Sequence, residues 1–282
     1  MATSDPLLVV IDPVARQTDG EAVRIAKDVL SAGAVTKVCL PDGPEEFARA
    51  LARRGSRRPV VVGDDGALVR AVSLLHRQRE LAGCVLSMVP VGSALSVARS
   101  LGVPTGTVAA ARAVLDGAPR RLDLLVDDSD GVVLGALRIP PVPAFPVPEG
   151  ASADPAHHWL RTCQSFVRTL VPTRPHRAPS TPATPRQGPS RLRVEVDGVT
   201  LVDLDQPVEA VSVTPDGAGV AAVEVRPSSV GAEAAPLLAK GRLVTVSGAD
   251  FRYRADAGVA GPVRRRTWTV WEEGLGLTLP VG

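Results

Sequence analysis

The sequence predicts a mixed fold, in which an α/β domain with a parallel sheet (residues 1–121) precedes an all-β domain, an antiparallel β-sandwich (residues 122–282). Two observations predict it. In the first part, short runs of β-branched and other apolar residues alternate with segments of helical periodicity, a pattern typical of parallel strands covered by helices. In the second part, many short apolar runs are separated by Gly, Asp and Pro turns, as in antiparallel sandwiches.

Short apolar runs predict the strands of the first domain, because a strand buried on both faces needs few polar positions. These strands cover residues 6–11, 35–40, 59–62 and 84–89. Apolar residues at helical spacing, such as Ile25 and Val29, predict helices between and after the strands. The helices cover residues 21–32, 44–54, 67–75, 94–101 and 105–115. We expect Pro44 in the first turn of its helix and Thr105 as the N-cap of the last helix.

The second domain begins with a predicted hairpin. Residues 122–126 and 132–139 have the composition of strands, and they flank a polar segment in which Asp130 and Gly131 favour a tight turn. Further strands are predicted at residues 192–196, 200–204, 208–213, 220–225, 243–246, 251–254 and 267–271.

Two proline-rich inserts interrupt this domain. Residues 140–155 and 172–190 each contain six prolines, and residues 154–170 between them have the periodicity of an amphipathic helix. The second insert has too few apolar side chains to fold alone and is predicted to be an extended linker. From residue 172 to 193 the chain carries five arginines and no acid.

Charge and cysteine content exclude several classes of protein. The formal net charge is +2, which gives no overall reason to expect a nucleic-acid partner. Cys39, Cys84 and Cys163 lie far apart without a CxxC pair, so neither a disulfide framework nor a zinc cluster is expected. We therefore expect a protein of the reducing cytoplasm.

One apolar segment approaches the length of a membrane span. Residues 81–98 contain no charge, but Gly83, Pro90 and Gly92 interrupt them. The segment is better explained as a strand, a turn and the start of a helix. The apolar run near the N-terminus is too short for a signal peptide.

Candidate chemistry lies in two consecutive strand-turn-helix segments. Gly63-Asp64-Asp65-Gly66 follows one predicted strand, and Pro90-Val91-Gly92-Ser93 follows the next. In a parallel sheet, ligands bind beyond the carboxyl ends of the strands, and helix N-termini offer free N–H groups to phosphates. A Gly-Asp-Asp-Gly segment is also ordinary turn chemistry, so the pair of turns carries more weight than either alone.

The segments resemble the motifs of the diacylglycerol kinase catalytic family, which includes bacterial lipid kinases and sphingosine kinases and is distantly related to NAD kinases. Residues 63–67 stand where the family has Gly-Gly-Asp-Gly-Thr, and residues 90–104 where it has Pro-x-Gly-Thr-x-Asn-Asp-Phe-Ala-Arg and then Leu-Gly-Ile-Pro. The sequence from Gly117 to Leu124 reproduces the family's basic residue and Asp-Leu. Residues 240–270 are similar to its closing strands with their Asp-Gly-Glu turn.

The resemblance implies a nucleotide-kinase-like first domain that uses ATP and Mg²⁺ to phosphorylate a lipid hydroxyl. It places the nucleotide around Gly63, Asp64, Gly66, Gly92 and Ser93. It implies catalytic roles for Asp65, Asp256 and, if its loop shifts, Asp216, with Asp65 and Asp256 as metal ligands. The implied partner is a lipid or other hydrophobic small molecule, with contact at the inner membrane surface and a homodimer as further expectations.

The departures from the family motifs favour a second hypothesis. Asp64 replaces a glycine at the phosphate cradle, and Ala67 replaces the threonine. Leu95 and Ser96 replace the Asn and Asp of the second motif, and Gly258 stands where the closing turn has Glu. The protein is then either a lipid kinase of weakened or lost activity, or a non-catalytic pseudokinase that binds lipid, nucleotide or protein. A rewired metal site built from Asp64 and Asp65 is a further reading.

Other candidates have simpler explanations. Arg264, Arg265 and Arg266 suit a solvated strand edge better than a phosphate or membrane site. Trp268 and Trp271 are expected to pack the sandwich, with lipid contact as the alternative.

Overall fold

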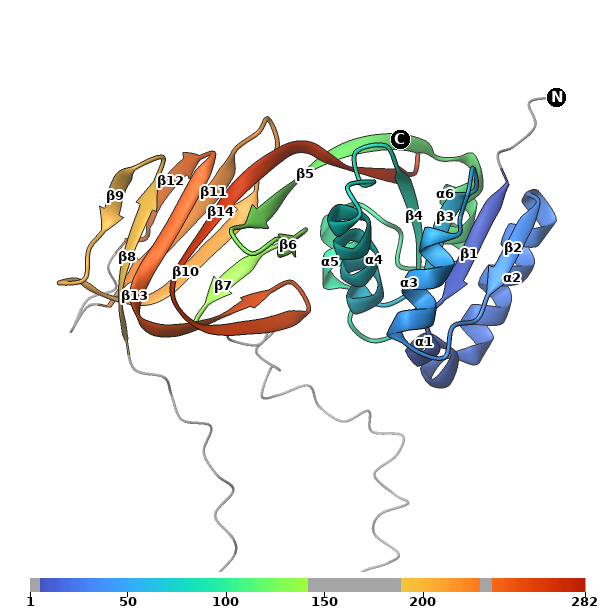
Figure 1. Ribbon diagram of the computed structural model, residues 1–282, viewed down its shortest axis with the longest axis horizontal. Coiled ribbons are helices and arrows are strands. Elements are labelled where there is room, and N and C mark those ends of the chain that lie inside the picture. Colours follow the sequence, from blue (N-terminus) through green and yellow to red (C-terminus); the bar gives the residue numbers. More distant parts are fainter. Residues whose placement is uncertain (1–5, 142–188, 229–234, 282) are drawn as a thin grey trace, which may run out of the picture. The chain divides into compact units, whose positions relative to one another are not determined.

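The computed structural model describes residues 6–141, 189–228 and 235–281 (Figure 1). Its N-terminal half contains four parallel strands in the order β4-β3-β1-β2. They are β1 (Leu7–Ile11), β2 (Thr36–Cys39), β3 (Arg58–Gly63) and β4 (Val85–Pro90). All four predicted strands are confirmed, with ends within one residue of the expected positions.

Helices cover both faces of these strands, because successive strand residues point to opposite sides. Leu8 and Val10 pack in one apolar cluster with side chains of α3 and α4, whereas Leu7 and Val9 pack in another with α2 and α6. The helices are α1 (Pro13–Thr18), α2 (Gly20–Gly33), α3 (Pro44–Ala52), α4 (Asp65–Arg77), α5 (Ser96–Ser100) and α6 (Thr107–Asp116).

Helix α1 and the starts of α4, α5 and α6 differ from the prediction, the three starts by two residues each. Helix α1 was not expected, although Asp12 followed by Pro13 is a strong start signal: Asp12 Oδ1 accepts the Val14 N–H at 2.9 Å, and Pro13 occupies the first helical position. The expected N-cap of α6 was wrong. The helix begins at Thr107, so Gly106 is its N-cap and Thr105 lies one residue too early.

The rest of the described chain forms antiparallel strands around a separate apolar cluster that includes Trp268 and Tyr253. Strands β10 and β13 each pair with both β7 and β8, so these four strands form a closed ring of pairings. The strands are β5 (Ala118–Asp127), β6 (Val132–Val133), β7 (Leu137–Ile139), β8 (Ser190–Val196), β9 (Val199–Val202), β10 (Pro207–Pro215), β11 (Ala221–Pro227), β12 (Leu237–Gly241), β13 (Leu243–Ala255) and β14 (Gly258–Leu279).

Strands β5 and β14 connect the antiparallel strands to the parallel ones (Figure 1). They pair with each other along their length, and Gly276 and Leu277 of β14 pair in parallel with β4. Strand β5 runs through residues 121 and 122, where the sequence placed a domain boundary. The mixture of helices, parallel strands and antiparallel strands is confirmed, while the division into a nucleotide-kinase-like domain and a β-sandwich stays a prediction.

Strand β14 also bears on two predictions about side chains. Around the arginine run it pairs with β13, and its pairing with β5 begins only at Trp268, so one side of the run has no strand partner among the described residues. Arg264 and Arg265 are exposed, but Arg266 is largely buried and its Nη1 lies 2.6 Å from Asp128 Oδ1. Trp268 packs among the antiparallel strands as expected, whereas Trp271 packs against the cluster formed by α3 and α4.

The remaining predictions concern the apolar segment and the inserts. Residues 81–98 form β4, a turn and the start of α5, as expected. No helix among the described residues is both long enough and apolar enough to cross a bilayer. The predicted helix at 154–170 and most of the predicted linker at 172–190 lie outside the described residues.

Candidate functional site

The two glycine turns lie side by side, as the sequence predicts for neighbouring strands. Gly63 is paired with Pro90 at the ends of β3 and β4, and the Val91 N–H donates to the Gly63 carbonyl at 2.8 Å. The Asp65 N–H donates to the Ala94 carbonyl at 2.9 Å. The turns that follow β3 and β4 are therefore joined by backbone hydrogen bonds.

Glycine is required at residue 63 by packing within the protein. A Cβ at this position would lie 2.7 Å from the Ala67 Cβ and 3.0 Å from the Asp12 Cβ. Gly92 has a φ of +127°, and a Cβ there would lie 3.2 Å from the Asp64 Cβ. These glycines let the ends of β1, β3 and β4 and the start of α4 approach closely, with or without a phosphate.

Asp64 occupies the N-terminus of α4. Its Oδ1 accepts the Ala67 N–H at 3.0 Å, which makes it the N-cap of the helix. The N–H groups of this first turn are the donors that a phosphate would use in a strand-turn-helix site. In this chain a carboxylate of the protein already uses one of them, and its negative charge lies where the phosphate charge would lie.

Asp65 is 1% exposed, and both of its oxygens bind the start of α5. Oδ2 accepts the Val97 N–H at 2.8 Å and the Ser96 hydroxyl at 3.1 Å, and Oδ1 accepts the Ala98 N–H at 2.9 Å. Ser96, which stands where the family motif has a carboxylate, thus donates a hydrogen bond to Asp65. Asp65 holds α5 in place.

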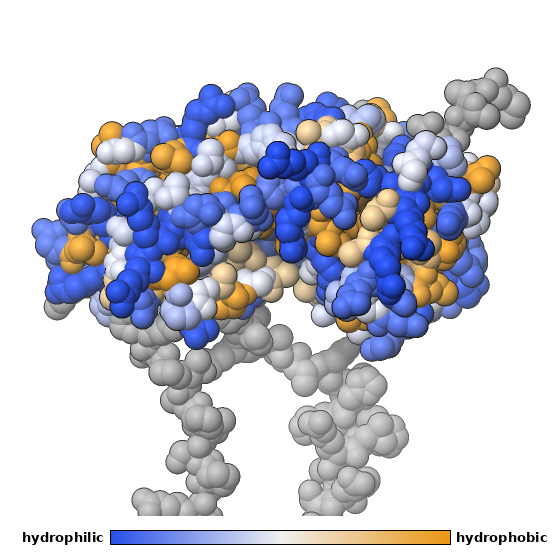
Figure 2. Space-filling view, in the orientation of Figure 1, coloured by the Kyte–Doolittle hydropathy of each residue, from blue (hydrophilic) through white to orange (hydrophobic). Residues whose placement is uncertain are grey.

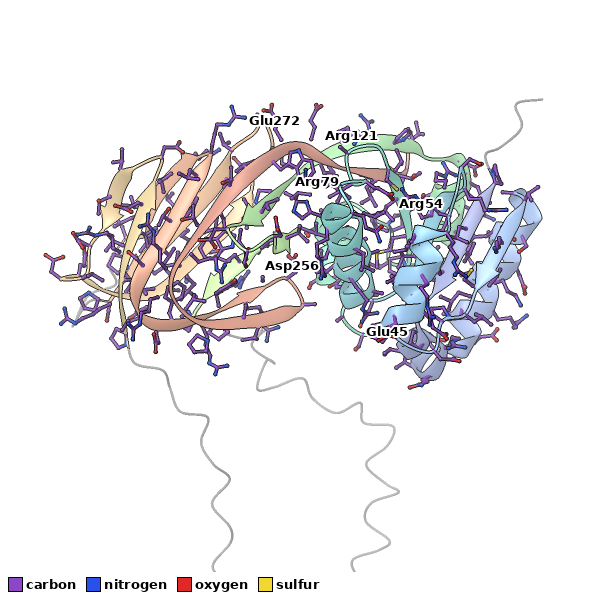
Figure 3. All side chains as sticks on the ribbon, in the orientation of Figure 1. Glu45, Arg54, Arg79, Arg121, Asp256 and Glu272 are labelled. Carbon is purple, nitrogen blue, oxygen red and sulfur yellow. The ribbon has the colours of Figure 1, made fainter. Side chains whose placement is uncertain are left out.

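Asp256 also accepts several backbone N–H groups, here from residues 134–136. It lies in the turn between β13 and β14 and accepts the N–H groups of Leu134 at 2.6 Å, Gly135 at 2.7 Å and Ala136 at 3.1 Å. Burial raises the pKa of Asp256, the charge of Asp65 acts in the same direction, and the three N–H groups oppose them. Figure 3 shows Asp256 near this turn.

The carboxylates of both aspartates are bound to backbone N–H groups. Every carboxylate oxygen of Asp65 and Asp256 accepts at least one backbone hydrogen bond. Within residues 6–141, 189–228 and 235–281, no group of three His, Cys, Asp or Glu side chains is arranged to hold a metal ion. The expected metal-ligand role of the two aspartates stays a prediction.

The remaining predicted residues lie apart from this pair. Asp216 forms an ion pair with Lys240 at 2.5 Å. It precedes three residues with positive φ, Gly217, Ala218 and Gly219. Ser93 is exposed on the second glycine turn, and Gly66 lies within the first turn of α4.

A cavity of about 460 Å³ includes Leu134 and Gly135, whose N–H groups bind Asp256. None of the eight predicted residues lines it. Its lining consists of Ser100, Leu101, Arg121, Leu122, Asp123, Leu134, Gly135, Thr214, Pro215, Gly217, Ala218, Glu272 and Glu273. Gly135 lines this cavity and also lies close to Asp256. A Cβ on Gly135 would lie 3.2 Å from Asp256 Oδ1 and 3.3 Å from Ser100 Oγ.

Sequence reasoning missed the acids of this cavity. Asp123 Oδ2 accepts the Gly219 N–H and Oδ1 accepts the Glu273 N–H, both at 2.8 Å, so it connects β5 to the loop after β10 and to β14. Glu272 pairs with Arg242 at 3.0 Å, and Figure 3 shows Glu272 and Arg121. The Asp-Leu match was the signal available for Asp123, whereas Glu272 and Glu273 belong to no motif.

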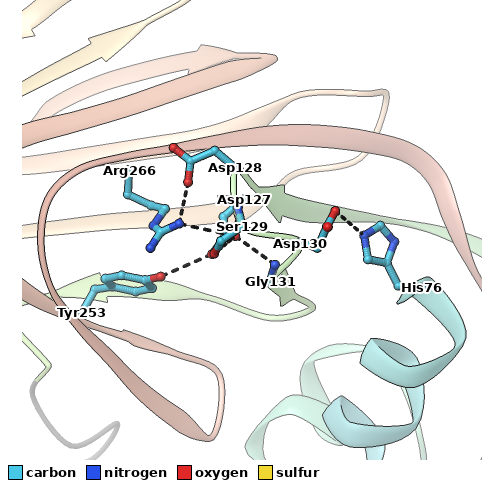
Figure 4. A network of polar contacts seen from close by, with 8 residues as sticks. All are labelled: His76, Asp127, Asp128, Ser129, Asp130, Gly131, Tyr253 and Arg266. Carbon is cyan, nitrogen blue, oxygen red and sulfur yellow. Dashed lines mark hydrogen bonds and ion pairs between the residues drawn. The ribbon is translucent and has the colours of Figure 1, made fainter. Parts of the chain in front are cut away.

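A second polar network lies at the β5–β6 turn (Figure 4). Burial favours a raised pKa for Asp127, but hydrogen bonds from Ser129 and Gly131 and the charge of Arg266 outweigh it, so the pKa is lowered. Tyr253 donates to the Asp127 carboxylate at 3.3 Å. The hydrogen bonds from Ser129 and Gly131 to Asp127 fix the conformation of this turn.

Comparison with known proteins agrees with this architecture. A family model for the diacylglycerol kinase catalytic domain matches residues 6–126. A search of the curated proteins finds no match. A solved structure of a proposed diacylglycerol kinase from Bacillus anthracis strain Sterne is similar with a TM-score of 0.69 at 14% identity, over 99% of this chain and 98% of that one.

A further solved structure, of a diacylglycerol kinase from the same strain, has a TM-score of 0.67 at 12% identity over the same shares of the two chains. At such identities the likeness shows a common fold. The matched segment contains both glycine turns, the α4 and α5 start sites and Asp123. Residues 6–126 of this chain are therefore similar to the diacylglycerol kinase catalytic domain.

Proposed function

We propose that this protein is a non-catalytic member of the diacylglycerol kinase family that binds an amphiphilic, hydroxyl-bearing ligand without phosphorylating it. The observation that carries the proposal is the position of Asp64, whose carboxylate caps α4 at the phosphate cradle. A carboxylate about 4 Å from a phosphate charge costs about 1 to 4 kcal/mol, depending on the local dielectric. The nucleotide would have to displace or neutralise it.

The two aspartates near α5 support the same conclusion. Phosphoryl transfer needs cations or donors that neutralise the transferred group and a base that accepts the hydroxyl proton. Asp65 and Asp256 direct their oxygens to backbone N–H groups instead. They stabilise the turn and α5, a role that persists without nucleotide.

The cavity of about 460 Å³ supports an amphiphilic ligand. Leu101, Leu122 and Leu134 supply apolar lining, while Arg121 and Glu272 supply charged groups for a polar head. Carboxylates accept hydrogen bonds from hydroxyl groups, such as the single free hydroxyl of a diacylglycerol. Such a ligand would bring the protein from the cytoplasm to the inner membrane surface.

A second candidate function is ATP-dependent phosphorylation of a lipid hydroxyl with weakened activity. The family match over residues 6–126 favours it, as do the retained Gly63, Gly66 and Gly92. On this reading a cation would neutralise Asp64 when Mg-ATP binds.

Thermal-shift titration with Mg-ATP distinguishes the two functions. A ligand at 100 times its dissociation constant stabilises by about 2.7 kcal/mol, so we expect no shift for the natural chain and a shift for Asp64→Gly. The matched control is Asp19→Gly, which removes the equivalent cap of α2, where Asp19 Oδ1 accepts the Ala22 N–H. A nucleotide-induced shift of the natural chain, together with transfer of labelled phosphate to diacylglycerol, would overturn the non-catalytic proposal.

Calorimetric titration with dioctanoylglycerol tests the ligand. We expect binding to the natural chain and loss of binding in Leu101→Asn, which places an amide in the cavity lining. Leu204→Asn is the control, because Leu204 is 44% exposed and does not line the cavity. Absence of binding to the natural chain, or equal binding by both variants, contradicts the assignment of this cavity.

A further inference from the structure

A second cavity, of about 330 Å³, lies between β2 and α3. It is lined by Leu8, Lys37, Cys39, Glu46, Arg49, Ala50 and Arg53. The α3 residues recur three or four positions apart and therefore share one face of the helix. Lys37 and Cys39 are two residues apart on β2, so they point to the same side of the sheet. None of these residues belongs to the site described above.

The lining of this cavity is cationic. It has three basic side chains and one acid, and the acid is already engaged: Glu46 Oε2 accepts the Asp42 N–H at 3.0 Å, and Oε1 lies 3.6 Å from Arg49. Lys37 and Arg53 form no ion pair or side-chain hydrogen bond with any residue that the structure describes. Figure 2 shows strongly hydrophilic residues along α3, and Figure 3 shows Glu45 and Arg54 near its two ends.

The base of the cavity is less polar. Leu8 is 1% exposed and belongs to the apolar cluster under α3, and Cys39 packs against the same cluster. Ala50 adds a small apolar surface on the helix side. A ligand here would meet carbon and sulfur below and two unpaired cations at the rim.

We propose that this cavity binds a phosphate monoester, with the phosphate between Lys37 and Arg53 and a short carbon body over Leu8, Cys39 and Ala50. Arginine and lysine are the side chains that recognise phosphate, and the volume is at the lower end of small-molecule sites. The assignment does not depend on the proposed function, because none of its lining residues lines the first cavity or belongs to the glycine turns. The glycine turns carry Asp64 where a phosphate would bind, whereas this cavity carries unpaired positive charge.

Cys39 makes the proposal measurable. Its thiol is half-buried in the cavity lining, whereas Cys84 is buried at 5% exposure and serves as an internal control. A phosphate monoester over Cys39 would block access of iodoacetamide. We expect glycerol 3-phosphate at ten times its dissociation constant to slow alkylation of Cys39 about tenfold, measured by peptide mass spectrometry. Glycerol, which lacks the phosphate, should give no protection.

Charge variants test which side chains bind the phosphate. Lys37→Gln and Arg53→Gln should each weaken the affinity about tenfold, because each removes one charge-assisted hydrogen-bond donor, so protection at the same concentration should fall to about twofold. Lys27→Gln is the control, since it removes the same charge from the exposed surface of α2. Thermal unfolding of each variant shows whether the fold is retained.

A vesicle experiment separates two sources of the phosphate monoester. Sedimentation with phosphatidylcholine vesicles containing phosphatidate, weakened by Arg53→Gln and not by Lys27→Gln, would assign the cavity to a lipid headgroup. Protection by glycerol 3-phosphate without sedimentation would assign it to a soluble metabolite. Neither protection nor sedimentation, or equal effects of Arg53→Gln and Lys27→Gln, would overturn the proposal.

Discussion

Asp65 and Ala98 are joined by a hydrogen bond of 2.9 Å from the Ala98 N–H to Asp65 Oδ1, across 33 residues of sequence. Both groups are buried, and the other Asp65 oxygen binds the Val97 N–H. The first residue of α4 therefore caps the five-residue helix α5. An aspartate in a motif associated with catalysis serves here as a structural anchor.

Replacement of Asp65 should destabilise the fold. Asp65→Ala leaves the N–H groups of Val97 and Ala98 without their acceptor, and each unpaired buried donor costs about 1 to 3 kcal/mol. Urea unfolding measures the loss. The control Asp19→Ala removes an exposed cap and should cost about 1 kcal/mol. Equal, small losses in both variants would contradict the anchoring role.

Restoring the family carboxylate at Ser96 should also destabilise the protein. The Ser96 hydroxyl lies 3.1 Å from Asp65 Oδ2, so Ser96→Asp places two carboxylates side by side. At such a distance the repulsion is about 1 to 4 kcal/mol at neutral pH. It should decrease as the pH falls and one carboxylate is protonated.

Ser96→Asn is the neutral control for this variant, and thermal unfolding from neutral to acidic pH measures both. Added Mg²⁺ separates the two interpretations of Asp65. Recovery of stability in Ser96→Asp with Mg²⁺ would show that the aspartates form a metal site, whereas no recovery agrees with the anchoring role.

Gly63→Ala should destabilise the protein without any nucleotide. The new methyl group would lie 2.7 Å from the Ala67 Cβ, and overpacking of this kind costs about 1 to 3 kcal/mol. The double variant with Ala67→Gly should recover part of the loss. Gly20→Ala, with no atom within 4 Å of the new Cβ, should not destabilise. If Gly63→Ala is as stable as the natural chain, packing does not require glycine at this position, and only contact with a ligand could explain it.

Asp127 should contribute stability that depends on pH. Its pKa in the folded state is below the ordinary value of 3.8, so the folded state binds fewer protons and the stabilisation is present above that value. It is lost as the pH falls through the folded-state pKa. The difference in unfolding free energy between the natural chain and Asp127→Asn should therefore be largest near neutral pH and shrink in acid.

The control for this pH profile is Asp205→Asn, which changes an exposed aspartate in the turn before β10. Chemical unfolding at a series of pH values measures both variants. A difference for Asp127→Asn that stays constant into acid would show that its network does not depend on the charge.

The sequence alone determined the order and type of most elements. The apolar runs at residues 6–11 and 59–62 form buried parallel strands. Apolar side chains on both sides of a strand are removed from water only when both faces of the sheet are covered. The two glycine turns were correctly expected to be neighbours, since β3 and β4 follow each other in chain and sheet. Local signals of this kind lie within a few residues and need no knowledge of the rest of the fold.

Only the tertiary structure decided what the polar residues do. Asp65 and Asp256 obtain their partners from segments 31 to 33 and 120 to 122 residues away, so no local pattern could show that backbone N–H groups use their lone pairs. The N–H of Glu273 donates to Asp123 across 150 residues of sequence, and Glu272 pairs with Arg242. Whether a carboxylate anchors the fold or is available for reaction therefore depends on long-range hydrogen bonds and ion pairs.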